Sequence, residues 1–125
     1  MFDQLRVYAA LPATDLERAK RFYAEKLGLT PQERADELRY ECGEGSAFFV
    51  FSTSISRRGG HTQVGIEVQD IEAAVAKLGS RGVTFEEYDT PELRTVDGIA
   101  IQPGGDRAAW FTDSEGNMLA LVEFS

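Results

Sequence analysis

Residues 11–19 read LPATDLERA, and residues 66–74 read IEVQDIEAA. At a shift of 55 positions these stretches agree in chemical character. Each one joins a segment of β character to a segment of helical character, so the sequence indicates two diverged copies of one structural unit. The matching pairs are Leu11 with Ile66, Asp15 with Asp70, Leu16 with Ile71, Glu17 with Glu72, and Ala19 with Ala74.

The first copy is predicted to begin with a strand over residues 5–11. Thr14 is placed to cap the following helix, and Glu17 three residues later would complete a capping box. Gly28 suits the turn that ends this helix. Three short strands are expected at about 30–35, 37–42 and 46–52, with Glu44-Gly45 as the last turn. The helical apolar stripe comprises Leu16, Ala19, Phe22, Tyr23 and Leu27.

The second copy is predicted to begin with a strand over 62–68, followed by a helix capped at Asp70. Further strands are expected at 83–88, 107–112 and 118–124. The intervening residues 89–106 form a long connection, which is typical of a lid or a binding loop. The stripe of this second helix comprises Ile71, Ala74, Val75 and Leu78.

The order βαβββ, repeated twice, predicts an α+β fold. We expect a single domain over 1–125, with module one at about 4–53 and module two at about 61–125. The helices would cover one face of a cupped mixed sheet. The last predicted strand, in GNMLALVEF (116–124), is apolar on both of its faces up to Glu123, so its second face also requires cover.

Composition narrows the classes of function. The formal net charge is −8, which disfavours nucleic acids and anionic membranes and favours cationic small molecules. The longest apolar run, residues 47–51, is far shorter than a membrane span. The first residues do not resemble a signal peptide, and Cys42 has no partner cysteine, so a cytoplasmic location is expected.

Two stretches, together with the repeat, resemble the vicinal oxygen chelate superfamily: DLERAKRFYAEKLGL (15–29) and WFTDSEGNMLALVEF (110–124). That superfamily includes glyoxalase I, extradiol dioxygenases, and fosfomycin- and bleomycin-resistance proteins. The resemblance covers nearly the whole chain. It implies paired βαβββ modules that form a cup, usually in a homodimer, with the site inside the cup.

The same resemblance implies four positions where the metal-binding members carry their ligands. They correspond here to Tyr8, Phe49, Gln63 and Ala120. Phenylalanine and alanine offer no donor atom, and a neutral tyrosine hydroxyl is a poor ligand. His61 and Glu67 share a strand face with Gln63, but residues along one strand are too far apart to converge easily. We therefore expect no metal ion and no other cofactor.

Strand alternation separates the residues that would face the helix from those that would face the inside of the cup. Val64, Ile66 and Val68 would face the helix, as would Val7, Ala9 and Leu11. Small residues at 10, 65 and 120 would leave room inside the cup. Phe49 and Phe51 could equally be core, Trp110 could line the mouth or be core, and Glu67 could simply reach solvent. The predicted ligand-binding residues are Tyr8, Phe49, Phe51, Gln63, Glu67, Trp110, Met118, Ala120 and Val122.

Three functions remain open from the sequence. The first is a protein that sequesters a hydrophobic or cationic small molecule, such as an antibiotic, similar to the metal-free bleomycin-resistance branch. The second is a glyoxalase-like lyase or isomerase with altered or absent metal ligation, for which Glu67, Tyr8 and His61 are the candidate catalytic residues. The third is a protein-interaction or regulatory module. Cys42 lacks an activating base and is expected to be a small buried residue.

Overall fold

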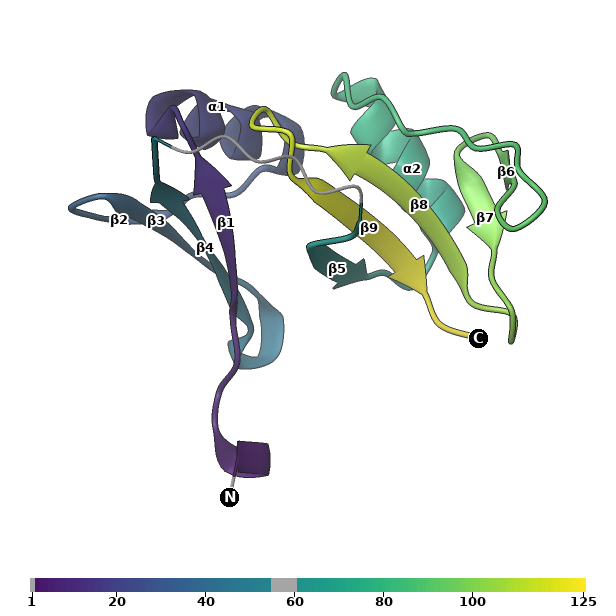
Figure 1. Cartoon of the computed structure of the whole chain (residues 1–125), viewed down its shortest axis with the longest axis horizontal. Helices are drawn as coiled ribbons and strands as arrows, with labels where there is room; N and C mark the ends of the chain where they lie inside the picture. The colour runs from purple at the N-terminus through teal and green to yellow at the C-terminus, as the bar shows by residue number, and fades with distance from the viewer. Residues whose placement is uncertain (1, 55–60) are drawn as a thin grey trace. The chain divides into compact units, whose positions relative to one another are not determined.

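The computed structural model describes residues 2–54 and 61–125, in two compact units, Met1–Arg58 (unit 1) and Gly59–Ser125 (unit 2). Each unit combines a mixed β-sheet with an α-helix (Figure 1). Unit 1 comprises η1 (Phe2–Gln4), β1 (Ala9–Ala13), α1 (Leu16–Leu27), β2 (Gln32–Arg34), β3 (Glu37–Glu41), η2 (Gly43–Gly45) and β4 (Ala47–Ser52). Unit 2 comprises β5 (Val64–Glu67), α2 (Ile71–Ser80), β6 (Thr95–Val96), β7 (Ile99–Ile101), β8 (Arg107–Thr112) and β9 (Met118–Glu123).

The two sheets follow one plan. Their strand orders are β1-β4-β3-β2 and β5-β9-β8-β7-β6. In each sheet the first strand pairs in parallel with the last strand of its unit, and the other pairs are antiparallel. The predicted α+β fold with tandem βαβββ modules is confirmed, and β6 is an addition in the second module.

Helix α1 begins at a different residue from the predicted one. The Asp15 side chain, rather than that of Thr14, accepts a hydrogen bond from the Arg18 backbone N–H at 3.0 Å. The third helical residue after Asp15 is Arg18, so the predicted capping box with Glu17 does not form. Gly28 ends the helix at φ 70°, as its position predicted.

The core of unit 1 lies between α1 and its sheet. Tyr23 of α1 is fully buried and lies against Tyr40 and Phe48, with ring centroids 5.1 and 5.4 Å away. Leu11 and Val50 are also buried and are paired across β1 and β4. The sheet face that packs against α1 therefore carries the apolar area whose burial stabilises unit 1.

The core of unit 2 is built in the same way. Asp70 caps α2 by accepting from the Ala73 N–H at 3.1 Å, as predicted. Ile71, at the start of this helix, is fully buried, as are Phe111 and Leu119 of the sheet. The register pairs Leu119 with Val64 and Leu121 with Ile66. The alternation predicted for strand 62–68 therefore holds over β5.

The first strand begins later than predicted. The sequence indicated residues 5–11, whereas β1 spans Ala9–Ala13 and pairs with β4 from Ala9 opposite Phe48 onward. Val7, predicted to face the helix, lies outside the strand and is 86% exposed. Pro12 continues the strand because β1 is at the sheet edge, where a missing N–H is tolerated.

The strand predicted at 83–88 is wrong. This segment is irregular and is tied to β8 through the Glu86 N–H, which donates to the Trp110 carbonyl at 2.7 Å. Strand β7 instead comes from the connection 89–106, so that connection is partly sheet and not wholly a lid or loop. Asp97 and Gly98 have φ of 52° and 81°, which is the backbone of a tight hairpin turn between β6 and β7.

The D-x-x-G-N stretch has a structural role. Asp113 is buried, and its Oδ1 accepts from the N–H groups of Glu115 and Asn117 at 2.8 and 2.9 Å. Its Oδ2 accepts from the Asn117 side chain at 2.8 Å. These bonds shape the turn that aligns β8 with β9. No helix in the described part of the chain is long and apolar enough to cross a membrane.

Candidate functional site

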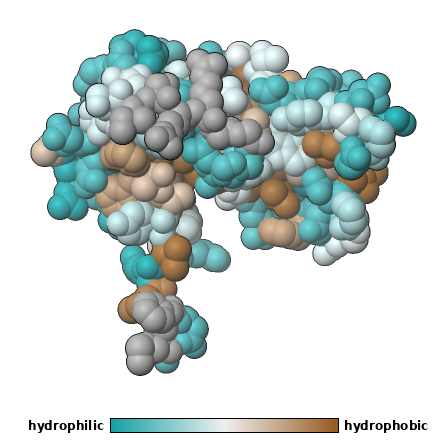
Figure 2. Space-filling model, in the orientation of Figure 1, coloured by the Kyte–Doolittle hydropathy of each residue, from teal (hydrophilic) through white to brown (hydrophobic). Residues whose placement is uncertain are grey.

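Each sheet has a second face, turned away from the helix of its own unit. In unit 1 the register places Ala10, Phe49 and Arg39 side by side on this face, across β1, β4 and β3. In unit 2 the corresponding row is Gly65, Ala120 and Trp110, across β5, β9 and β8. Figure 2 shows apolar atoms over β1 and β4 and again over β5 and β9. These two second faces contain most of the predicted ligand-binding residues.

The second face of unit 1 is centred on an aromatic pair. The ring of Tyr8 lies 4.6 Å from that of Phe49, measured between centroids, and the Arg39 guanidinium lies 5.1 Å from the centre of the Phe49 ring. Phe49 is only 8% exposed, whereas Tyr8 is 60% exposed. Phe51, two residues along β4, is exposed and is paired with Pro12 and Glu37. Phe49 is therefore a covered platform, and Tyr8 and Phe51 remain accessible.

Arg39 was not among the predicted site residues. Its Nε donates to the Glu41 carboxylate at 3.2 Å, and its side chain is half-buried. The sequence does hold a signal for its position. Within residues 37–41, ELRYE, the apolar Leu38 and Tyr40 are buried against the helix side, so the alternating polar residues must occupy the other face.

The second face of unit 2 combines open space with one large aromatic wall. A Cβ atom added at Gly65 would meet nothing within 4 Å. Ala120, next to it on β9, is buried at 3% exposure, and Trp110 pairs with Ala120 from the other side. Met118 and Val122 are half-buried on the same face of β9. The small residues at 65 and 120 therefore leave room beside an indole ring.

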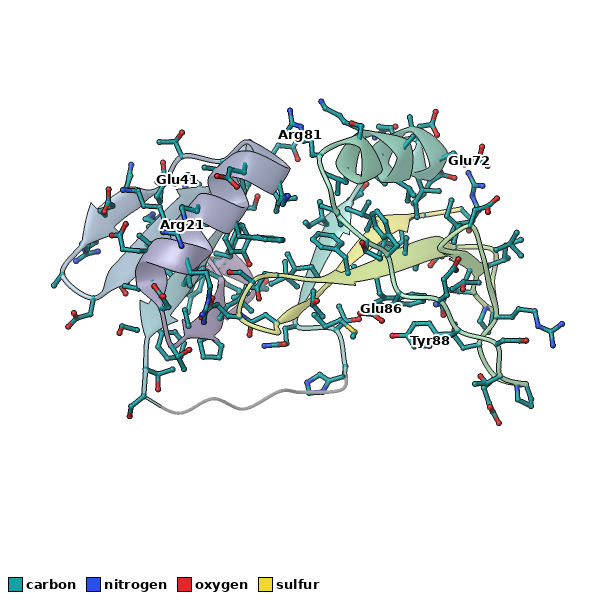
Figure 3. All side chains as sticks on the ribbon, turned by 90° about the horizontal axis from the view of Figure 1, so that it is seen from above. Arg21, Glu41, Glu72, Arg81, Glu86 and Tyr88 are labelled. Atoms are coloured by element: carbon teal, nitrogen blue, oxygen red, sulfur yellow. The ribbon has the colours of Figure 1, made fainter. Side chains whose placement is uncertain are left out.

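Trp110 is held in position by two contacts. Its indole N–H donates to the Thr62 hydroxyl at 3.0 Å, and the Tyr88 ring meets it edge-on, with centroids 5.8 Å apart and planes at 81°. The indole is half-buried and lies on the second face, not in the helix-side core. Figure 3 places Tyr88 and Glu86 on the side of the sheet away from α2. Tyr88 was not among the predicted site residues, and its segment, residues 83–88, was predicted to be a regular strand.

The side-chain amide of Gln63 is hydrogen-bonded to the turn that precedes β9. Its Oε1 accepts from the Met118 N–H at 2.9 Å, and its Nε2 donates to the Asn117 side chain at 3.1 Å. Its own N–H donates to the Met118 carbonyl at 2.8 Å. Gln63 therefore joins β5 to the start of β9, and its amide is already hydrogen-bonded within the unit.

The three candidate catalytic groups, Glu67, His61 and Tyr8, are each exposed. Within residues 2–54 and 61–125, none of their side chains forms a hydrogen bond or an ion pair. A general base or acid is normally oriented by a partner group. Cys42, expected to be buried, is exposed in the turn before β4, where its N–H donates to the Ser46 carbonyl.

The residues at the four family ligand positions do not fit a divalent ion. Phe49 and Ala120 have no donor atom, and the Gln63 oxygen already accepts from a backbone N–H. Across the two described ranges, no group of three or more His, Cys, Asp or Glu side chains is placed to hold a metal.

Comparison with known proteins identifies the family of this chain. The chain matches the model of the Glyoxalase/Bleomycin resistance protein/Dioxygenase superfamily over residues 6–121. No curated protein matches it.

Solved structures share the fold. A superfamily member from Sphaerobacter thermophilus DSM 20745 superposes with a TM-score of 0.73 at 24% identity, covering 98% of this chain and 99% of that one. TnmS3, an antibiotic binding protein from Streptomyces sp. CB03234, gives 0.68 at 23% identity, covering 100% and 99%. A glyoxalase/bleomycin resistance protein/dioxygenase from Nocardioides gives 0.69 at 21% identity, covering 96% and 83%. With residues 6–121 of the chain matched by the family model and both βαβββ modules in place, this chain belongs to the Glyoxalase/Bleomycin resistance protein/Dioxygenase superfamily.

Proposed function

We propose that this protein binds and sequesters a hydrophobic or cationic small molecule, such as an antibiotic, on the second faces of its sheets, without a metal ion. The observation that carries this proposal is the row of Gly65, Ala120 and Trp110. It combines open space, an apolar floor and an aromatic wall. Small-molecule sites are mostly apolar with few polar groups. The antibiotic-binding protein TnmS3, which has the same fold, supports this class of ligand.

Charge supports the cationic option. The chain has a net charge of −8, and Glu67 stands exposed on the second face, two residues from Gly65. A positively charged aromatic compound could contact both an indole ring and a carboxylate. The lyase or isomerase alternative has less support, because its candidate acid and base groups have no orienting partners among the described residues.

Binding is tested by following Trp110, the only tryptophan in the sequence. Purified protein is titrated with a panel of planar aromatics and cationic antibiotics, including 9-aminoacridine (cationic) and N-phenyl-1-naphthylamine (neutral). Intrinsic fluorescence and Tm are the two readouts. The proposal predicts saturable quenching and a raised Tm for at least one compound. A panel without any response would overturn it.

Gly65→Val tests where the compound binds. The structure offers room for the new side chain, and valine favours strands, so Tm should stay constant or rise. The side chain would fill the space beside Ala120, and affinity for the panel compound should fall about ten-fold or more. Gly79→Ala is the matched control, because it also adds a Cβ in open space, but in α2. Unchanged affinity in Gly65→Val would remove this row from the site.

We further propose that the protein acts as a homodimer in the cytoplasm. The presence of a single cysteine supports a reducing compartment. Exposed apolar side chains such as Val96 and Ile101, at 70% and 76% exposure, support self-association. Light scattering after size exclusion should give twice the chain mass of 13.8 kDa. A monomer at micromolar concentration would contradict the dimer but leave ligand binding intact.

A further inference from the structure

Arg39 is a cation beside the aromatic residues on the second face of unit 1. It lies on β3, whose partner β4 places Phe49 directly beside it, and its guanidinium is 5.1 Å from the Phe49 ring centre. The contact is of the cation–π type, and the side chain is 27% exposed. Two neighbours therefore fix the guanidinium: the Phe49 ring beneath it and the Glu41 carboxylate, which accepts from Nε at 3.2 Å.

The contacts with Phe49 and Glu41 do not use the terminal amino groups of Arg39, Nη1 and Nη2. Its hydrogen bond to Glu41 uses only Nε, and within the part of the chain that the structure describes neither Nη1 nor Nη2 forms a hydrogen bond. A guanidinium has five N–H donors in a rigid planar fork that matches carboxylate-like oxygens. Because Phe49 and Glu41 already hold the guanidinium plane in place, little conformational entropy would be lost when a ligand oxygen binds to it.

The surroundings of these donors favour an aromatic ligand. Tyr8 stands 4.6 Å from Phe49 between ring centroids and is 60% exposed, and Phe51 is exposed on the same face. We propose that Arg39 is a specificity-determining residue, which donates hydrogen bonds to an oxyanion or carbonyl oxygen of an aromatic ligand lying against Tyr8 and Phe51. This inference rests on the proposed function and concerns the second face of unit 1, whose ligand it narrows to aromatic compounds with such an oxygen. The cationic option concerns Glu67 and the Gly65 row of unit 2.

Two probes of one scaffold test the inference. 1-Anilinonaphthalene-8-sulfonate carries a sulfonate, and N-phenyl-1-naphthylamine is the same ring system without it. Both fluoresce when they enter an apolar site. Replacing Arg39 by glutamine should weaken sulfonate binding about ten-fold, the typical cost of a lost charge-assisted hydrogen bond, and change binding of the neutral probe less than about two-fold. Arg39→Lys keeps the charge but loses the fork, and should give an intermediate loss for the sulfonate.

Arg34→Gln is the matched control for charge. Arg34 lies on the neighbouring strand β2 and is paired in register with Glu37, so its side chain belongs to the same sheet face as that of Arg39. Its Nε is 3.7 Å from the Glu37 carboxylate, and its side chain is 66% exposed. The control removes the same unit charge but leaves the Phe49 platform intact, so sulfonate affinity should stay within about two-fold.

The outcomes separate this inference from the proposed function. If neither probe binds the wild type and the wider panel gives no response, the proposed function itself fails. If the neutral probe binds and Arg34→Gln weakens sulfonate binding as much as Arg39→Gln does, only the role of Arg39 fails. Arg39→Gln shifting a dimer to a monomer, with both probes affected alike, would also overturn the ligand assignment and place Arg39 in an interface.

Discussion

Tyr40 shows at the scale of one residue how packing can override hydrogen bonding. It is 1% exposed, stacks on Phe48 with centroids 4.9 Å apart, and contacts Tyr23, yet among the described residues its hydroxyl lacks a partner. Burial raises the pKa of Tyr40 to about 12, and the charge of Glu33 adds to the shift. The phenol therefore stays neutral, and it keeps the cost of an unmade hydrogen bond.

Tyr40→Phe should therefore stabilise the protein. The ring contacts survive the change and the orphaned hydroxyl disappears, so the free energy of unfolding should rise by about 1 kcal/mol. Urea denaturation at pH 7 measures it. Tyr8→Phe, which removes an exposed hydroxyl, should leave stability unchanged. A loss of stability in Tyr40→Phe would show that the hydroxyl has a partner, such as a buried water.

Glu123 joins two elements of unit 2. Its Oε1 accepts from the Ile71 N–H at the start of α2 at 3.0 Å, and its Oε2 accepts from the Arg107 guanidinium of β8. The backbone hydrogen bond from Ile71, followed by the Arg107 hydrogen bond, lowers the pKa of Glu123 below its usual value of 4.5. The last strand is thereby tied to the first turn of the helix.

This arrangement predicts a pH-dependent stability. The pKa of Glu123 is lower in the folded state than in the unfolded state. The contribution of its carboxylate to the free energy of unfolding is therefore present above pH 4.5, and it is lost as the pH falls through the folded-state pKa. Glu123→Gln should have a lower Tm than the wild type at pH 7, and this difference should shrink below about pH 4. Glu92→Gln changes an exposed carboxylate and serves as the control. A Tm difference that is constant from pH 7 to pH 3 would contradict the account.

Element prediction succeeded where one signal dominated. Asp70 caps the start of α2 and Gly28 ends α1, both as expected, and 107–112 is a strand with those bounds. Thr14 and Asp15 are adjacent residues that could both cap the helix; in the structure Asp15 is the cap, with an extended backbone at φ −139° and a side chain that accepts from the Arg18 N–H. The Asp97-Gly98 hairpin had a recognisable sequence, yet its flanking strands are only two and three residues long. Such short strands form through sheet pairing, not through their own propensity.

At the scale of the whole molecule, the internal repeat predicted the fold, and strand alternation predicted which residues lie on each face of the sheets. The residues on the second faces were mostly predictable, because alternation assigns Ala10, Gly65 and Ala120 by counting. Their partners were not, since Arg39 beside Phe49 and Tyr88 against Trp110 depend on register and on an irregular segment. The amide of Gln63 was predicted to be a polar group for a ligand, and its hydrogen bonds within unit 2 could be found only from coordinates.

Two of the four positions at which the family resemblance implies metal ligands carry side chains without donor atoms. Phe49 and Ala120 replace donor atoms with a ring and a methyl group, which favours apolar contact over metal chelation. Binding should therefore depend on the shape and aromatic character of the second faces. It should not depend on divalent ions.

The most direct test is one titration of chelator-treated protein with a compound selected from the panel, followed through Trp110 fluorescence. We expect saturable binding with the same Kd before and after EDTA treatment, and no change on adding zinc, nickel, manganese or iron. Binding that disappears with EDTA and returns with one of these ions would contradict the account.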